Sequence, residues 1–216
     1  MSVEAIVARI TDISPDHRRE GRFDVIVDGK RVAVLSMEAI DRLRLHTGDP
    51  FTEALGERIA AESEQVRVFD RALAMLASRS RAARELRLAL VRKREPEALV
   101  DAAVSKLLRI GALDDARFAR QFVRSRISRA GFSTRRLQAE LARRGVDRAA
   151  ADAAIAEVRA DESIDPAETL ERLAARKLRM MSKLDAPTRD RRLYAFLARR
   201  GYDSSEIRSV MQTLAE

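Results

Sequence analysis

The stretch RRLQAELARRG, from Arg135 to Gly145, returns almost unchanged 56 positions later as RRLYAFLARRG, from Arg191 to Gly201. The alignment of the two stretches continues without a gap until Ile155 matches Met211. Equal spacing over such a distance indicates a repeated supersecondary unit, because repeats of this kind bury their apolar faces against one another. The repeat therefore decides the expected fold.

A weaker copy lies 51 positions upstream of the middle one. Leu86 and Leu90 stand there in the places of Leu137 and Leu141. Each copy is expected to form three helices, the leading ones near residues 68–79, 115–129 and 166–181, because apolar residues recur in each at helical spacing. Four glycines are expected to end helices in the left-handed conformation, and these are Gly111, Gly131, Gly145 and Gly201.

The chain up to about residue 60 has a different pattern. RFDVIVDGKRVAVLS alternates on both sides of Asp28-Gly29, a dipeptide that favours a two-residue type I′ hairpin turn. With that turn, Val25 is expected to face Val32 across the ribbon. The preceding AIVARITDI predicts a third strand, and a short helix is expected over Ser36–Leu43.

The expected fold is mainly α, with tandem three-helix repeats after a small N-terminal β-hairpin-containing unit. The composition agrees, since Ala, Leu and Arg dominate while there are 7 Phe, 2 Tyr and no Trp. The expected domains are residues 1–62 for the β-containing extension, then 63–113, 114–162 and 163–216 for the first, second and third three-helix repeats.

The sequence lacks the patterns of a catalytic site. It has no cysteine, its histidines are His17 and His46, and it has no Gly-x-x-x-x-Gly-Lys phosphate loop. Asp114 and Asp115 suggest paired metal ligands, but acids at this position more readily cap the next helix. We predict no catalytic, cofactor or metal site, and hence no enzyme. No apolar run approaches the roughly 18 residues of a membrane span, so a soluble cytoplasmic protein without a membrane partner is expected.

The net charge of +8 is concentrated in one window. Ten arginines and two acids, Glu140 and Asp147, lie between Arg117 and Arg148, so this window alone carries +8. A basic patch on a neutral body predicts a polyanionic partner, either nucleic acid or an acidic protein surface. A structural role accounts for four arginines that are expected in last helical turns, where the helix dipole favours cations, namely Arg143, Arg144, Arg199 and Arg200.

Arg135 and Arg136 are expected in the first turn of a helix, where the dipole opposes positive charge and another role is indicated. On an ideal helical wheel, Arg143 shares a flank with Arg136. We predict that six arginines form a partner-binding surface: Arg117, Arg120, Arg124, Arg135, Arg136 and Arg143. Arg126 falls inside an apolar arc, and the sequence leaves open whether it snorkels past the packed face or pairs with a carboxylate.

The stretch LLRIGALDDARFARQFVRSRISRAGFSTRRLQAELARRGVDRAAADAAI resembles the central region of the RecX regulatory proteins. The resemblance lies in a Leu-x-Asp-x-x-Phe-Ala opening, a glycine joint and a Leu-x-x-x-Leu-x-x-x-Gly middle helix. It covers residues 66–216, and ASRSRAARELRLALVRK is similar to the first repeat of that family. The first repeat departs from the pattern, because Arg94-Glu95-Pro96 replaces the glycine-based stop.

The resemblance implies an elongated, curved array of repeats that binds the RecA filament on DNA. It also implies a non-catalytic regulator that inhibits or tunes the ATPase and strand exchange of RecA in DNA repair and the SOS response. The expected partners are the RecA filament and single- or double-stranded DNA, contacted by a monomer. Two alternatives remain, a basic helical protein that binds DNA without RecA and an undetected nuclease. The sequence leaves open whether the β-containing unit contacts any partner.

Overall fold

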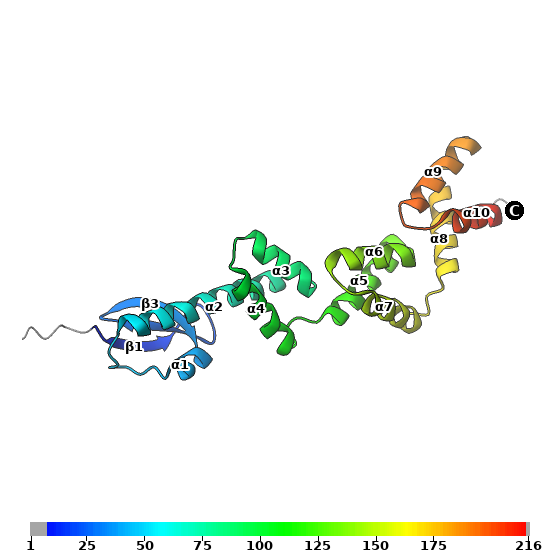
Figure 1. Ribbon diagram of the computed structural model, residues 1–216. Coiled ribbons are helices and arrows are strands. Elements are labelled where there is room, and N and C mark those ends of the chain that lie inside the picture. Colours follow the sequence, from blue (N-terminus) through cyan, green and yellow to red (C-terminus); the bar gives the residue numbers. More distant parts are fainter. Residues whose placement is uncertain (1–7, 215–216) are drawn as a thin grey trace, which may run out of the picture. The chain divides into compact units, whose positions relative to one another are not determined.

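The computed structural model describes residues 8–214, and this part of the chain forms three strands and ten helices (Figure 1). The strands are β1 (Ile10–Pro15), β2 (Arg22–Val27) and β3 (Lys30–Ser36). The helices are α1 (Met37–Leu43), α2 (Glu53–Ser78), α3 (Ala83–Arg92), α4 (Glu97–Arg109), α5 (Asp115–Ala130), α6 (Thr134–Arg144), α7 (Arg148–Asp161), α8 (Pro166–Arg179), α9 (Ala186–Ala198) and α10 (Ser204–Thr213). The predicted class, mainly α with a small N-terminal sheet, is confirmed.

The chain divides into two compact units. Unit 1 contains the chain up to Arg79 together with Arg87–Arg109, and unit 2 contains Ser80–Leu86 together with the chain from Ile110 onward. Helix α3 therefore begins in unit 2 and ends in unit 1.

The sheet of unit 1 is antiparallel, in the order β1-β2-β3. The turn between β2 and β3 is confirmed as a two-residue turn, because Val27 pairs with Lys30. Asp28 and Gly29 both have positive φ, 46° and 76°, as a type I′ turn requires. The first residues of the predicted AIVARITDI strand, 5–7, lie outside the described residues, and β1 itself begins at Ile10.

The predicted register between β2 and β3 is wrong beyond the turn. A β-bulge shifts the pairing between Val25 and Ile26, so that Val25 lies opposite Ala33 and not opposite Val32. The bulge leaves Val32 45% exposed, whereas Ala33 and Leu35 face the core. An alternating pattern cannot locate such a bulge, since one extra residue moves every later side chain to the other face.

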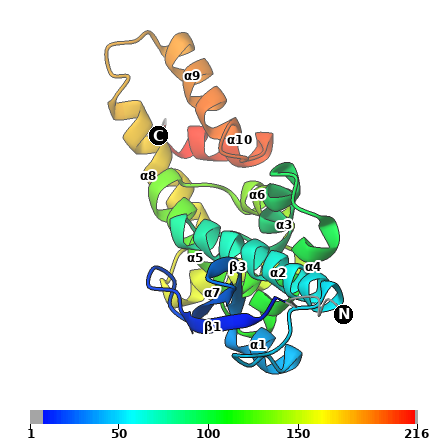
Figure 2. The same cartoon turned by 90° about the vertical axis from the view of Figure 1, so that its left-hand side faces the viewer.

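Helices α1 and α2 complete the core of the sheet. Ser36 caps α1 by accepting a hydrogen bond from the Ala39 amide, and α1 then covers the predicted span. Thr52 caps α2, which begins well before the predicted residue 68 and lies across the sheet (Figures 1 and 2). Ile59 of α2 is buried in the same cluster as the strand residues. Because α2 runs unbroken past residues 62 and 63, the sheet and the first repeat share one helix.

Helix α3 ends without glycine. Arg94 takes the left-handed conformation there, with φ 62°, a place that glycine fills in the other two repeats. Glu95 follows and is 5% exposed. It forms ion pairs with Arg67 (2.7 Å) and Arg71 of α2. The pKa of Glu95 is held below its ordinary value, mainly by the hydrogen bond from Arg67. Two guanidinium groups thus compensate this buried carboxylate.

Four helices of unit 2, α5, α6, α8 and α10, begin at predicted caps. Asp114 accepts a hydrogen bond from the Arg117 amide (2.9 Å), and Ser133 accepts one from the Arg136 amide (3.3 Å). Pro166 follows the capping Asp165, and Asp203 forms a complete capping box at α10. Asp115 does more than favour the dipole of α5, because it accepts a hydrogen bond from the Ala83 amide at the start of α3 (2.7 Å).

Two apolar clusters organise unit 2. Residues of α5, α6 and α7 form one cluster, in which Leu137 and Leu141 are fully buried. Residues of α8, α9 and α10 form the other, which includes Leu193 and Leu197. Figures 1 and 2 both show α8, α9 and α10 packed together. Each cluster is the core of one three-helix repeat.

The same contact joins successive repeats twice. Gly145, after α6, packs on Arg84 in the first turn of α3, where an added Cβ would lie 2.3 Å from the Arg84 Cβ. Gly201, after α9, packs on Arg136 in the first turn of α6, where an added Cβ would lie 2.6 Å from the Arg136 Cβ. Both glycines have φ near 90°. Glycine is therefore required at both positions by the backbone conformation and by the space available.

Candidate partner-binding surface

Three of the predicted arginines, Arg135, Arg136 and Arg143, lie together in one open groove of about 290 Å³. The groove runs between α6 and the residues that follow α9, because Gly201 brings that end of the chain onto the first turn of α6. Arg199 lines the groove from the opposite side. The groove arginines, as we call Arg135, Arg136, Arg143 and Arg199, are one cationic surface built from two repeats.

A single carboxylate, Glu140, organises this side of α6. It forms ion pairs with Arg144 (2.8 Å), Arg143 (3.5 Å) and Arg136 (3.8 Å). The hydrogen bond from Arg144 is the main reason why the pKa of Glu140 lies below its ordinary value. Glu140 therefore stays ionised at neutral pH and holds three guanidinium groups, while the groove retains an excess of positive charge.

The groove arginines differ in how many contacts their guanidinium groups make within the protein. The Arg136 guanidinium lies 4.2 Å from the centroid of the Phe132 ring, a cation–π distance, and its side chain is half-buried. The Arg143 side chain is 74% exposed. Among the described residues no carboxylate pairs with Arg135 or Arg199. Arg135, Arg143 and Arg199 are thus the charges most available to a partner.

The sequence predicted that few acidic side chains lie among the arginines of α5. The structure places acidic side chains beside two of them. Arg120 pairs with Glu157 of α7 (3.5 Å), and Arg124 pairs with Glu162 and Asp161 at the end of α7. These acids follow the basic window in sequence, so a count within the window does not include them. This face of α5 is therefore mixed in charge. Arg117 is exposed, and no described carboxylate pairs with it.

A cluster of alternating arginine and phenylalanine side chains, which was not predicted from the sequence, links α5 to α6. Arg126 lies 5.2 Å from the Phe122 centroid and 5.9 Å from the Phe132 centroid, while Arg144 lies 4.6 Å from Phe122. Arg126 is exposed and pairs with no carboxylate among the described residues, so its guanidinium covers aromatic faces instead. The signal was a Phe-x-x-x-Arg spacing, since Phe122 and Phe132 each stand four residues before their arginine.

Arg199 and Arg200 have separate roles. Both were predicted to lie in the last turn of their helix, but α9 ends at Ala198 and both residues follow it. Arg200 lies 3.6 Å from the Phe196 centroid, and its Nε donates to the Ala130 carbonyl (2.8 Å). Burial is the main cause that lowers the pKa of Arg200. Arg200 therefore holds the second and third repeats together, whereas Arg199 belongs to the groove.

Within residues 8–214, no group of three or more histidine, aspartate or glutamate side chains could hold a metal ion. Both histidines are exposed, and the Nδ1 atom of His46 lies 3.7 Å from Asp49. None of the helices in this range has the length and hydropathy of a membrane span.

Comparison with known proteins gives consistent matches. The family model described as "RecX, second three-helix domain" matches residues 114–155, and the one described as "RecX, third three-helix domain" matches residues 164–211. The regulatory protein RecX of Mycolicibacterium vanbaalenii is 37% identical over 165 residues, which cover 74% of this chain and 85% of the relative. That of Amycolatopsis mediterranei is 41% identical over 128 residues, which cover 59% and 71% of the two chains.

Solved structures share the fold. The crystal structure of a regulatory protein RecX aligns with a TM-score of 0.74 at 22% identity, covering 95% of this chain and all of the other. The RecX structure from Lactobacillus salivarius aligns with a TM-score of 0.57 at 18% identity, covering 70% of this chain and 97% of the other. The tandem three-helix architecture is thus shared at low sequence identity.

Proposed function

This chain belongs to the RecX family of regulatory proteins, and we propose that it binds the RecA recombinase filament on DNA and lowers or tunes its ATPase and strand exchange. In this proposal the protein acts as a cytoplasmic monomer and performs no chemistry of its own. The relatives are named regulatory proteins, which supports the non-catalytic part.

The groove between α6 and the end of α9 is the observation that carries the proposal. It presents Arg135, Arg143 and Arg199 with a single carboxylate, Glu140, among its lining residues. Guanidinium groups form bidentate hydrogen bonds with carboxylates and phosphates, so a filament of protein and DNA offers suitable partners on both components. Arg136 is assigned to the same surface, at its inner edge.

The arginines of α5 form a second part of the proposed surface. Arg117 is available as it stands, whereas Arg120 and Arg124 must exchange their α7 carboxylates for groups of the partner. Such exposed ion pairs contribute only about 0 to 1 kcal/mol, so the exchange costs little. Arg120 and Arg124 are therefore proposed to contribute less to binding than the groove arginines.

The contact that joins the repeats supports a periodic partner. Gly145 on Arg84 and Gly201 on Arg136 place the end of one middle helix on the start of the preceding one. A repeated joint of this kind presents similar side chains at regular steps along a repeat protein. A helical filament also offers its sites at regular steps.

A titration of the full-length protein into a RecA ATPase assay on single-stranded DNA tests the proposal. The wild-type protein should suppress ATP hydrolysis, and the double variant Arg135→Gln, Arg143→Gln should need about tenfold more protein for the same effect. The matched control is Arg148→Gln, Arg191→Gln, which removes two exposed charges outside the groove and should act like wild type. Unchanged ATPase and strand exchange at saturating wild-type protein would refute the function.

Direct action on DNA without RecA is the second candidate, favoured by the exposed Arg135 and Arg143 of the groove. Titration of the same proteins into free single- and double-stranded DNA separates the two candidates. The second candidate requires binding to free DNA that weakens with salt and with the groove variant, together with RecA activity that changes only as DNA is sequestered.

A further inference from the structure

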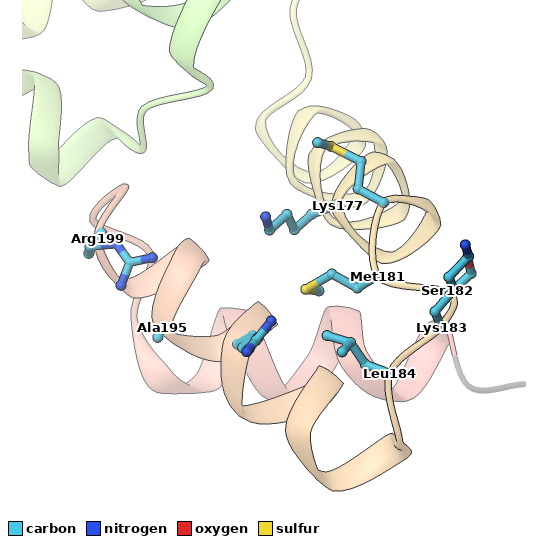
Figure 3. Close-up of a pocket in the computed structure, with 9 residues that line it drawn as sticks. Lys177, Met181, Ser182, Lys183, Leu184, Ala195 and Arg199 are labelled. Carbon is cyan, nitrogen blue, oxygen red and sulfur yellow. The ribbon is translucent and has the colours of Figure 1, made fainter.

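A second pocket, of about 530 Å³, lies within the third repeat (Figure 3). The end of α8, residues 180–184 and α9 line it. Its floor is apolar, formed by Met181 (6% exposed), Leu184 and Ala195. Figure 3 shows the side chains of Lys177, Met181 and Leu184 pointing into the space between α8 and α9. The size falls in the range of pockets that enclose a ligand group.

The rim of the pocket is cationic. Lys177, Lys183, Arg192 and Arg199 line it, and the lining residues include no acid. Lys177 lies 5.2 Å from the Phe196 centroid, which fixes its ammonium group at the edge of the floor. Lys183 and Arg192 are exposed and form no ion pair with a described carboxylate. The rim therefore offers positive charge to an incoming group.

The nearby acid is already committed to the fold. Asp185 is the N-cap of α9 and accepts a hydrogen bond from the Thr188 amide (3.0 Å). That hydrogen bond is the main cause that lowers the pKa of Asp185, and Arg192 contributes to the same direction. Asp185 does not line the pocket, and of the four rim cations it attracts Arg192.

An exposed methionine completes the site. Met180 lines the pocket and is 74% exposed. Methionine is flexible and polarisable, so it adapts to apolar groups of different shapes at binding surfaces. Met180 and Met181 thus provide an adjustable apolar wall beside the four cations of the rim.

We propose that this pocket binds an acidic peptide segment of a partner protein, with one bulky apolar side chain seated on Met181 and Leu184. The carboxylates that flank this side chain pair with Lys183 and Arg192 on the rim. The cationic rim accounts for the carboxylates of the ligand, and the apolar floor accounts for its bulky apolar side chain. The inference goes beyond the function proposed above, because it concerns a separate pocket and requires neither recombinase nor DNA.

A nucleic acid strand fits the pocket less well. Single strands are held by aromatic side chains on which bases stack, and no aromatic ring lines this pocket. A sugar-phosphate backbone would contact the four cations but leave the floor of Met181, Leu184 and Ala195 without an apolar partner. A peptide satisfies both, because its side chains alternate in chemistry along a short extended segment.

Fluorescence anisotropy of the full-length protein with a fluorescein-labelled acidic peptide tests the proposal. The probe consists of Asp and Glu residues around a central Leu-Phe pair. The variant Lys183→Gln, Arg192→Gln should weaken binding about tenfold, as expected for the loss of two ion contacts. The matched control, Arg179→Gln, Arg191→Gln, removes two exposed charges of the same repeat outside the pocket and should change affinity by less than about twofold. Arg199 is left unchanged, because it also lines the α6 groove.

The apolar half of the proposal has its own test. Met180→Ser leaves every charge in place and affects a side chain that is already exposed, so folding should be unchanged by circular dichroism. It should weaken the Leu-Phe peptide about threefold, and a peptide with Ser-Ser in place of Leu-Phe should bind weakly to wild type.

Three results would overturn the assignment. The first is an equal loss of affinity in the rim variant and its matched control, which indicates nonspecific attraction. The second is equal binding of the Ser-Ser and Leu-Phe peptides, which removes the apolar anchor. The third is binding of a fluorescein-labelled oligothymidylate that depends on Lys183 and Arg192 while the peptide does not bind. None of these results bears on the RecA titration, so the two proposals fail separately.

Discussion

Helices α6 and α9 carry nearly the same eleven residues, but the stretch occupies different parts of the two helices. In α6 the stretch begins two residues after the N-cap Ser133, so Arg135 lies in the first turn. Helix α9 begins at Ala186, so the matching Arg191 lies beyond the first turn. The dipole therefore opposes Arg135 and not Arg191. The same residue type therefore has a different interaction energy with the helix dipole in the two copies, because the preceding residues start each helix at a different point.

The inward residues keep their roles in both copies. Leu137 and Leu141 are fully buried in α6, and Leu193 and Leu197 are buried in α9. The residues between these leucines also correspond, since Gln138 donates to Asp152 of α7 and Tyr194 bonds to Ser204 of α10. In both repeats the middle helix is thus tied to the closing helix from the same position of the middle helix, although the two partners differ.

The outward residues change their partners. Arg144 pairs with Glu140 one turn earlier, whereas the matching Arg200 stacks on Phe196 at the position of Glu140. The first turn of α6 is covered by Gly201 of the next repeat. Arg192, which matches Arg136, borders an open pocket. The contacts of an arginine in this fold therefore depend on the groups that neighbouring helices place beside it.

The largest expected effect comes from breaking the contact between repeats. Gly201→Ala requires a side chain at φ 90° and places its Cβ 2.6 Å from the Arg136 Cβ. We expect a loss of about 3 kcal/mol in the free energy of unfolding, measured by urea denaturation of the full-length protein. Gly111→Ala is the matched control, because Gly111 has φ 69° and open space around it, and should lose about 1 to 2 kcal/mol. Equal losses would show that the contact itself contributes nothing.

A second experiment separates the adjacent arginines after α9. Arg200→Gln removes the stacking on Phe196 and the hydrogen bond to Ala130, so stability should fall by about 1 to 2 kcal/mol while RecA filament binding changes little. Arg199→Gln should leave the melting temperature unchanged, weaken filament binding about threefold and flatten its dependence on salt. Arg143→Gln, on the opposite side of the groove, should match Arg199→Gln. If Arg199→Gln and Arg200→Gln change stability and filament binding in the same way, Arg199 does not belong to the binding surface.

The pH dependence of Glu140 gives a smaller effect. Its pKa is lower in the folded protein than the ordinary value of 4.5, so its charge stabilises the fold above about pH 4.5. This stabilisation is lost as the pH falls through the pKa of the folded state. Glu140→Gln should therefore lose up to about 1 kcal/mol at pH 7, and the difference from wild type should shrink in acid. Phe196→Leu changes the matching position of α9. Its free energy of unfolding should differ from that of wild type by the same amount at pH 7 and in acid.

The smallest effect concerns the helix dipole. Arg135→Ala removes a cation from the first turn of α6 and should stabilise the protein by a few tenths of a kcal/mol more than Arg191→Ala, which lies outside the first turn of α9. Arg135 also attracts the carboxylate of Asp203, whose pKa is lowered mainly by Ser205, and this attraction limits the gain. Differential scanning calorimetry of the two variants in low salt measures the difference. A loss larger than that of Arg191→Ala contradicts the dipole argument.

Local signals predicted the fold well. The caps at Ser133, Asp165 and Asp203 and the glycine ends of the helices could be read from the sequence because each depends on a few adjacent residues. The β-bulge at Val25 escaped, since an alternating pattern is compatible with either register. The long α2 also escaped, because its first half packs on the sheet and carries no clear apolar stripe.

The candidate site was predicted only in part. Arg135, Arg136 and Arg143 lie together, as their spacing on one helix suggested. The sequence did not reveal that Arg199 faces them, because the contact at Gly201 that brings it there joins two repeats. It also did not reveal that Arg120 is paired, since Glu157 lies on another helix.

The sequence alone determined that this protein is a series of helical units with leucine cores, capped starts and glycine ends, because periodicity and backbone preference act over a few residues. The packing of the helices determines which arginines line the groove and which are ion-paired or stacked on a ring. The charge of a surface depends on groups that packing brings within a few ångströms, and Coulomb interactions in water are screened beyond roughly 10 Å. Glu157 and Gly201 are remote from α5 and α6 in sequence but close to them in the fold.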